Sequence, residues 1–228
     1  MNGMEEQQLD LLGTDIEVMC RALCLSLKDN SALVQRSALD LLLQGFPAHQ
    51  PHFVAEDMAG LVTNMLTTLL RRDMSLNRRL FSWLLGSEIN TSLLPSNHPN
   101  VLSDQSNGYF LTYAADLLVK AVALIMEQGV PLPGSQKGVD IKPFRIVTTL
   151  MDKTEIGPVI IDRIMLDTLR TFYHMSRYLE DSPASETGPT KQELVKTANL
   201  LFAQLETSYI WKYCGDQFGI ACKDLKID

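Results

Sequence analysis

Apolar side chains recur along this chain at the spacing of amphipathic helices. In the segment 109–128, Phe110, Leu117 and Leu124 lie on one stripe, and a second apolar stripe runs beside it. A stripe that wide indicates a helix that is buried on several sides. Runs of alternating β-branched residues bounded by turn residues, which would predict strands, are missing. The fold class is therefore predicted to be all-α.

Turn and capping residues divide this pattern into about eight helices. Gly45 and Gly86 each follow an apolar run and predict a helix end. Thr14 and Thr190 are each followed three residues later by Glu, which is the pattern of a capping box at a helix start. The expected helices span residues 14–28, 32–44, 56–72, 76–85, 109–128, 142–152, 158–179 and 190–213.

The segments between these helices predict a repeat architecture. Residues 87–107 are polar and predict a long surface loop, 129–139 form a Pro/Gly connector, and 181–189 form a polar loop. Helix pairs begin near residues 15, 56, 108 and 157, a recurrence of roughly 40 to 50 residues that is typical of HEAT or armadillo stacking. We therefore expect residues 1–228 to form a single helical-repeat domain, a short α-solenoid.

Several large apolar residues are expected to form the core of this domain. They are Trp83, Leu84, Leu117 and Leu169. Trp83 has an alternative role as an anchor for a partner protein, because Trp is enriched at binding hot spots. Its position among other apolar residues favours core packing, since aromatic side chains dominate burial in helical proteins.

Composition excludes several functional classes. The net charge of −7 argues against nucleic-acid binding, which needs a basic surface. The four cysteines, without an N-terminal apolar signal segment, favour a reducing compartment. The most apolar stretch, 117–126, is about half the length needed to cross a bilayer, so no transmembrane segment is expected. The sequence predicts a cytoplasmic protein.

No sequence motif predicts catalysis. The chain has no P-loop, no G-x-S-x-G and no H-E-x-x-H, and its Gly-rich segment lacks a dinucleotide fingerprint. Cys20 and Cys24 lie one helical turn apart, but no further ligand is near them in sequence, so buried thiols are favoured over a metal site. We expect no catalytic residue, cofactor or metal.

Four arginines gather around the junction between the third and fourth expected helices. They are Arg71, Arg72, Arg78 and Arg79. Guanidinium groups bind phosphate or carboxylate groups with two hydrogen bonds, so a phosphoinositide headgroup or an acidic partner surface is a candidate ligand. The alternative is that they cap backbone carbonyls and pair with Asp40, Asp73 or Glu88. Pairing is favoured, because such clusters are common on solvated faces and each exposed pair contributes only up to about 1 kcal/mol.

Four segments resemble the N-terminal domain of one protein family. They are DIEVMCRAL (15–23), DNSALVQR (29–36), RRDMSLNRRLFSWLLG (71–86) and DLLVKA (116–121). In this order they resemble the Dopey family, large proteins of Golgi and endosome traffic. The resemblance is specific over residues 15–120 and looser beyond. Family members have helices upstream and continue far beyond Asp228, so a fragment or short isoform is expected.

The resemblance implies a non-catalytic scaffold or adaptor peripheral to Golgi and endosome membranes. It implies protein partners, among them a relative of the large Arf exchange factors, and contact with anionic phosphoinositide membrane. Two alternatives stay open. The chain could be an enzyme whose site assembles only in three dimensions, or an inert fragment that competes for the partners of longer relatives.

Overall fold

The computed structural model describes residues 15–49, 53–86, 108–131, 138–181 and 188–224. Within these ranges the chain forms nine α-helices and no strand, which confirms the all-α class. The α-helices are α2 (Ile16–Lys28), α3 (Ala32–Gly45), α4 (Ala55–Thr67), α5 (Met74–Leu85), α8 (Ala115–Gly129), α9 (Lys142–Met151), α10 (Gly157–Asp181), α11 (Lys191–Phe202) and α12 (Thr207–Asp224). Two shorter turns complete the set, the 3₁₀-helix η1 (Thr68–Arg71) and the π-helix η2 (Phe110–Ala114).

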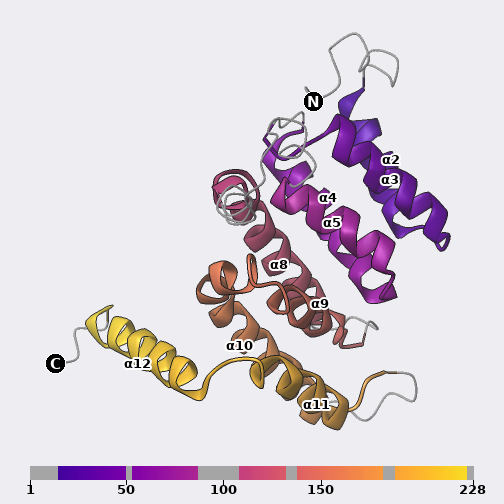
Figure 1. The fold of residues 1–228 in the computed structure, drawn as a ribbon. Helices are drawn as coiled ribbons and strands as arrows, with labels where there is room; N and C mark the ends of the chain where they lie inside the picture. Colours follow the sequence, from indigo (N-terminus) through magenta and orange to yellow (C-terminus); the bar gives the residue numbers. More distant parts are fainter. Residues whose placement is uncertain (1–14, 50–52, 87–107, 132–137, 182–187, 225–228) are drawn as a thin grey trace.

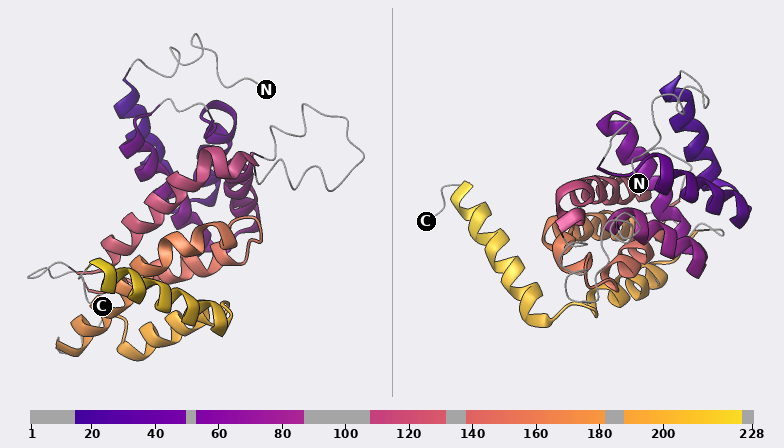
Figure 2. Two further views of the ribbon diagram at one scale, coloured as in Figure 1. Left: turned by 90° about the vertical axis from the view of Figure 1, so that its left-hand side faces the viewer. Right: turned by 45° about the horizontal axis from the view of Figure 1, so that its top comes forward.

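The helices contact one another in two layers, as expected for a short α-solenoid. In one layer α2 contacts α4, α4 contacts α8, and α8 contacts α10. In the other, α3 contacts α5, η1 bridges α5 to α9, and α9 contacts α11. Figure 1 shows this succession from the α2–α3 pair to α11, with α12 standing away from the stack. Both views of Figure 2 follow the same succession from another side.

Side-chain caps fix several helix ends close to the predicted positions. The Thr190–Glu193 capping box is present at the start of α11, as predicted. At the start of α2 the prediction was wrong, because Asp15 is the cap and its carboxylate accepts a hydrogen bond from the Val18 amide at 3.1 Å. Thr14 lies outside the described residues. Asp73 caps α5 by accepting from two amides of its first turn.

The predicted helix 56–72 is shorter than expected. α4 ends at Thr67, and the chain continues as the 3₁₀ turn η1. The hydroxyls of Thr67 and Thr68 each donate to a carbonyl three residues earlier, both at 2.7 Å. Arg72 then takes a left-handed conformation with φ of 55°, which ends the helical run. The tightened turn places the Arg72 side chain beside α9 and α11 rather than along α4.

The predicted helix 190–213 is two helices. α11 ends at Phe202 and α12 begins at Thr207. The amides of Gln204 and Leu205 bond to carbonyls three residues earlier, which tightens the chain into a turn. The Gln204 side chain donates to Asp152 Oδ1 at 2.6 Å and Leu205 packs against the core, so tertiary contacts hold the break.

The predicted loops fall largely outside the described residues. This applies to all of 87–107, to 132–137 of the predicted connector, and to 182–187 of the predicted polar loop. The margins of the last two differ from prediction. Gly129 is the last residue of α8, and Asp181 is the last residue of α10.

A continuous apolar core lies between the two layers. Trp83 is 2% exposed, and its indole N–H donates to the Phe46 carbonyl at 2.9 Å, while Leu84 is fully buried. Leu117 and Leu169 are half-buried and pack against this core from its edge. Apolar side chains stay exposed toward the two ends of the stack, as at Leu25 on α2 and Trp211 on α12.

Candidate functional site

Two of the four clustered arginines make hydrogen bonds to neighbouring elements, and the other two have exposed side chains. Arg71 Nη2 donates to the carbonyls of Asp29 and Asn30, at 3.1 and 2.5 Å, in the turn between α2 and α3. Arg79 Nε donates to Asp40 Oδ1 on α3 at 2.6 Å. Both arginines therefore tie neighbouring helices together, and their charges are used inside the fold.

The other proposed carboxylate partners behave differently. Asp73 pairs with Arg36 on α3, with 2.7 Å between Oδ2 and Nη2, and this hydrogen bond holds the pKa of the Asp73 carboxyl below its usual range. Glu88 lies outside the described residues. Arg72 and Arg78 are exposed, and neither makes an ion pair with another described residue. Arg78 lines a shallow hollow with Met74 and Lys153, whereas Arg72 lines a separate, more basic one.

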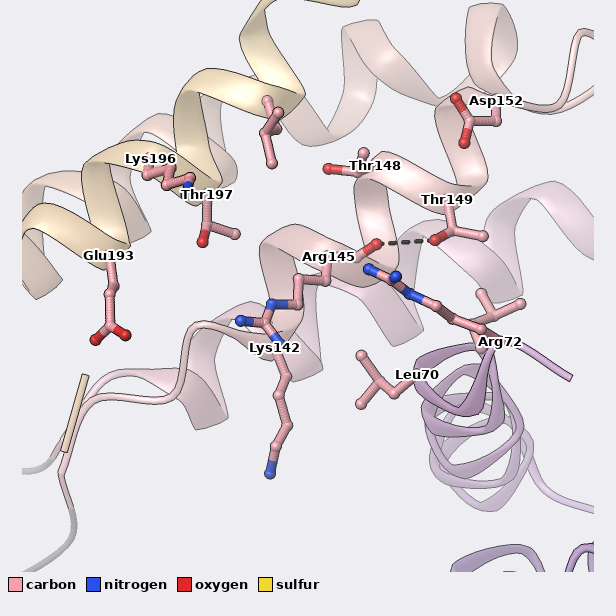
Figure 3. A pocket seen from close by; sticks show the side chains of 12 residues that line it. Leu70, Arg72, Lys142, Arg145, Thr148, Thr149, Asp152, Glu193, Lys196 and Thr197 are labelled. Carbon is pink, nitrogen blue, oxygen red and sulfur yellow. Dashed lines mark hydrogen bonds between the residues drawn. The ribbon is translucent and has the colours of Figure 1, made fainter. Parts of the chain in front are cut away.

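The groove that Arg72 lines is the candidate site. It has a volume of about 800 Å³ and lies between the end of η1, α9 and α11. Figure 3 shows its side chains coming from all three elements, with Arg72 extending toward α9. Four cations line it, and we call it the basic groove. The cations are Arg72, Lys142, Arg145 and Lys196.

Helix amphipathicity places these cations. α9 buries Phe144, Val147 and Leu150, so its opposite face carries Lys142 and Arg145 outward. α11 likewise buries Leu194, Ala198 and Leu201. Its remaining face brings Lys196 to the groove from the other side. The same face exposes Leu200, which is 60% exposed.

Most of the cations in the groove have no ion-pair partner among the described residues. The two carboxylates of the groove form no ion pair with these cations and instead accept hydrogen bonds from neutral groups, Glu193 from the Thr190 amide at 2.8 Å and Asp152 from the Gln204 side chain. Lys142 Nζ lies 3.7 Å from Asp140, outside the groove. Arg72, Arg145 and Lys196 make no ion pair with any described residue. The groove therefore offers unpaired positive charge on a chain of net charge −7.

The described residues that line the groove include neither His nor Cys. They do include lysine, carboxylate and threonine side chains, which can also take part in proton transfer or nucleophilic attack. Elsewhere, burial raises the pKa of the Cys20 thiol to about 12, which keeps it protonated and unreactive at neutral pH. In the described ranges no three His, Cys, Asp or Glu side chains gather as a metal site.

Sequence reasoning found Arg72 but missed the other groove cations. The arginines that the sequence singles out all lie within residues 71–79, whereas the groove joins residues far apart in the chain. A local signal was available on α9, where Lys142, Arg145 and Thr149 recur at i, i+3 and i+7 opposite the apolar face. No local signal indicates that this face meets Arg72 and Lys196.

Two family models match successive parts of the chain. The model of the Dopey N-terminal domain matches residues 1–89, and that of the DOP1 middle TPR domain matches residues 109–227, more than half of the chain. The chain belongs to the Dopey family. The basic groove of this Dopey-family chain draws on both matched regions, because Arg72 lies in the first and the other three cations lie in the second.

Relatives of this Dopey-family chain come from animals and yeast. It is 39% identical to Protein DOP1 homolog of Drosophila melanogaster, over 96% of the chain and 8% of that protein. It is 36% identical to Protein DOP1B of Mus musculus, over 93% of the chain and 10% of that protein. It is 29% identical to Protein DOP1 of Saccharomyces cerevisiae, over 89% of the chain and 11% of that protein. The chain thus spans about a tenth of the length of these relatives.

No solved structure matches the chain. Among the described helices, none is both long enough and apolar enough to pass through a bilayer.

Proposed function

We propose that this chain is a non-catalytic scaffold or adaptor segment in Golgi–endosome membrane traffic, cytoplasmic and peripheral to those membranes. Membership of the Dopey family supports the setting. The observation that carries the scaffold role is the two-layer helical stack, which presents a solvent-open basic groove on its surface. Helical stacks of this kind bind partners along extended surfaces.

The proposed partners are proteins of Golgi–endosome transport, including a relative of the large Arf exchange factors. Proximity labelling in cells tests this proposal. A labelling enzyme fused to the chain is expected to mark Golgi and endosomal transport proteins above a control fusion. Labelling confined to metabolic or nuclear proteins would contradict it. Displacement of a longer family member from membranes by the expressed chain would instead favour the competing-fragment alternative.

A second proposed activity is peripheral contact with anionic phosphoinositide membrane through Arg71, Arg72, Arg78 and Arg79. It is favoured by the exposure of Arg72 and Arg78, which have no ion-pair partner among the described residues. Because Arg71 and Arg79 are engaged inside the fold, Arg72 and Arg78 are expected to carry this contact. The test is cosedimentation with phosphoinositide vesicles. A folded Arg72→Glu plus Arg78→Glu variant that binds them as well as the original chain does would refute the contact.

A further inference from the structure

We propose that the basic groove binds an acidic peptide segment of a partner protein, one that carries a leucine-like side chain beside its carboxylates. This inference deepens the proposed scaffold function and depends on it. It assigns to the groove a class of ligand, and it gives three cations from the two matched regions, Arg72, Arg145 and Lys196, a common role.

The charge of the groove favours an acidic ligand. Elsewhere in the fold, three arginines pair with a carboxylate of a neighbouring element, as in the Arg163–Asp116 pair at 2.8 Å between α10 and α8. In the groove, Arg72, Arg145 and Lys196 have no such partner among the described residues. Because exposed like charges repel one another, a cluster without partners is neutralised best by a ligand that brings its own negative charge.

The groove lining between the cations is partly apolar. Leu70 is half-buried and Leu200 is 60% exposed, so apolar surface lies beside the charged groups. Burying a leucine-like side chain of a ligand against this surface removes apolar area from water and so favours binding. A peptide supplies both carboxylates and apolar side chains, whereas a lipid headgroup supplies charge alone. The combination therefore favours a peptide.

Several hydrogen-bond donors in the groove are already used within the fold. The hydroxyls of Thr148 and Thr149 donate to carbonyls of their own helix, at 2.7 and 3.0 Å. The first turn of α11 is closed by its own capping box, and Glu193 places a carboxylate there. A phosphate site uses free backbone amides and hydroxyls at a helix start. Here the amides of Thr190 and Glu193 are bonded within the capping box, as are the two threonine hydroxyls of α9 within their own helix. Carboxylates on separate peptide residues can instead reach Arg72, Arg145 and Lys196 one at a time.

The test is direct binding of a labelled synthetic peptide in which Asp and Glu alternate with Leu, followed by fluorescence anisotropy on the full chain. We expect saturable binding that weakens as salt rises. The Arg145→Glu plus Lys196→Glu variant is expected to bind about tenfold or more weakly, since it removes and reverses two charge contacts. Peptides with Asn and Gln in place of the acids, or Ser in place of Leu, are expected to bind more weakly.

The matched control is Lys212→Glu plus Lys223→Glu on α12, which makes the same charge change at two exposed lysines outside the groove. It is expected to bind the peptide as the original chain does, and circular dichroism shows whether both variants are folded. Equal binding by the two double variants would overturn the assignment. So would binding of phosphoinositide vesicles, through these same groove residues, without binding of the peptide. If the peptide fails to bind while proximity labelling still marks transport proteins, the groove assignment falls and the scaffold function stands.

Discussion

The two tryptophans of the chain, Trp83 and Trp211, lie in opposite environments. Replacing each of them therefore tests how much a buried and an exposed side chain contribute to stability. Trp83 is buried in the core and hydrogen-bonded to Phe46, whereas Trp211 on α12 is 73% exposed. We expect Trp83→Ala to lower the free energy of unfolding by about 3–5 kcal/mol, the usual cost of emptying an aromatic site. Trp211→Ala is expected to change it by about 0.5 kcal/mol or less. Urea denaturation measures both, and equal effects would contradict the burial assigned here.

Asp73 gives a prediction about pH. Its hydrogen bond to Arg36 lowers the pKa of the folded carboxyl below the ordinary 3.8. A depressed folded pKa adds stability that is complete above the unfolded pKa and is lost as pH falls through the folded value. Asp73→Asn should therefore lower the unfolding midpoint at neutral pH, with a difference from the original chain that shrinks below about pH 4. Thermal unfolding over a pH series measures it.

Asp216→Asn on α12 is the control for Asp73→Asn, because it removes one exposed carboxylate for which no ion pair is recorded among the described residues. It is expected to leave the unfolding midpoint nearly unchanged. A difference between Asp73→Asn and the original chain that stays constant down to acid pH would rule out the carboxylate contact as its cause.

At the scale of elements, Gly86 ends α5 where the first matched region closes. It has a φ of 65°, and a Cβ at this position would lie 2.6 Å from the Tyr109 ring. Gly86→Ala is expected to cost about 1–3 kcal/mol through backbone strain, with the ring contact adding to it. The control is Gly60→Ala in α4, where a Cβ meets nothing within 4 Å and the change is expected to stabilise by roughly 0.5–1 kcal/mol. Urea denaturation measures the free energy of unfolding of both variants. Equal stability of Gly86→Ala and Gly60→Ala would contradict the backbone conformation and the Tyr109 contact described at Gly86.

Helix ends were predictable from the sequence where a residue marks them chemically. Gly45 and Gly86 each mark a helix end, and Thr190 with Glu193 marks the start of α11. The break between α11 and α12 contains no Gly or Pro that would mark it in the sequence. Contacts of Gln204 and Leu205 with residues distant in the chain hold it instead. The groove escaped prediction for the same reason, since its cations meet only through tertiary packing. Periodicity identifies a helix and its buried face, but not the neighbour of its polar face.

At the scale of the whole molecule, the two matched regions are continuous in the stack. α4 lies in the first region and contacts α8 in the second, and η1 of the first contacts α9 of the second. We therefore predict one cooperative unfolding transition, with equal calorimetric and van't Hoff enthalpies. Scanning calorimetry measures both enthalpies. Two resolved transitions would mean that the regions fold separately and that the groove joins two independent domains.

The most direct test of a scaffold that works through its basic groove compares proximity labelling by three folded forms of the chain in cells. The original chain and the Lys212→Glu plus Lys223→Glu control are expected to mark the same transport proteins. The Arg145→Glu plus Lys196→Glu form is expected to lose a defined subset whose members carry acidic, leucine-containing segments. Identical labelling by all three forms would contradict the account.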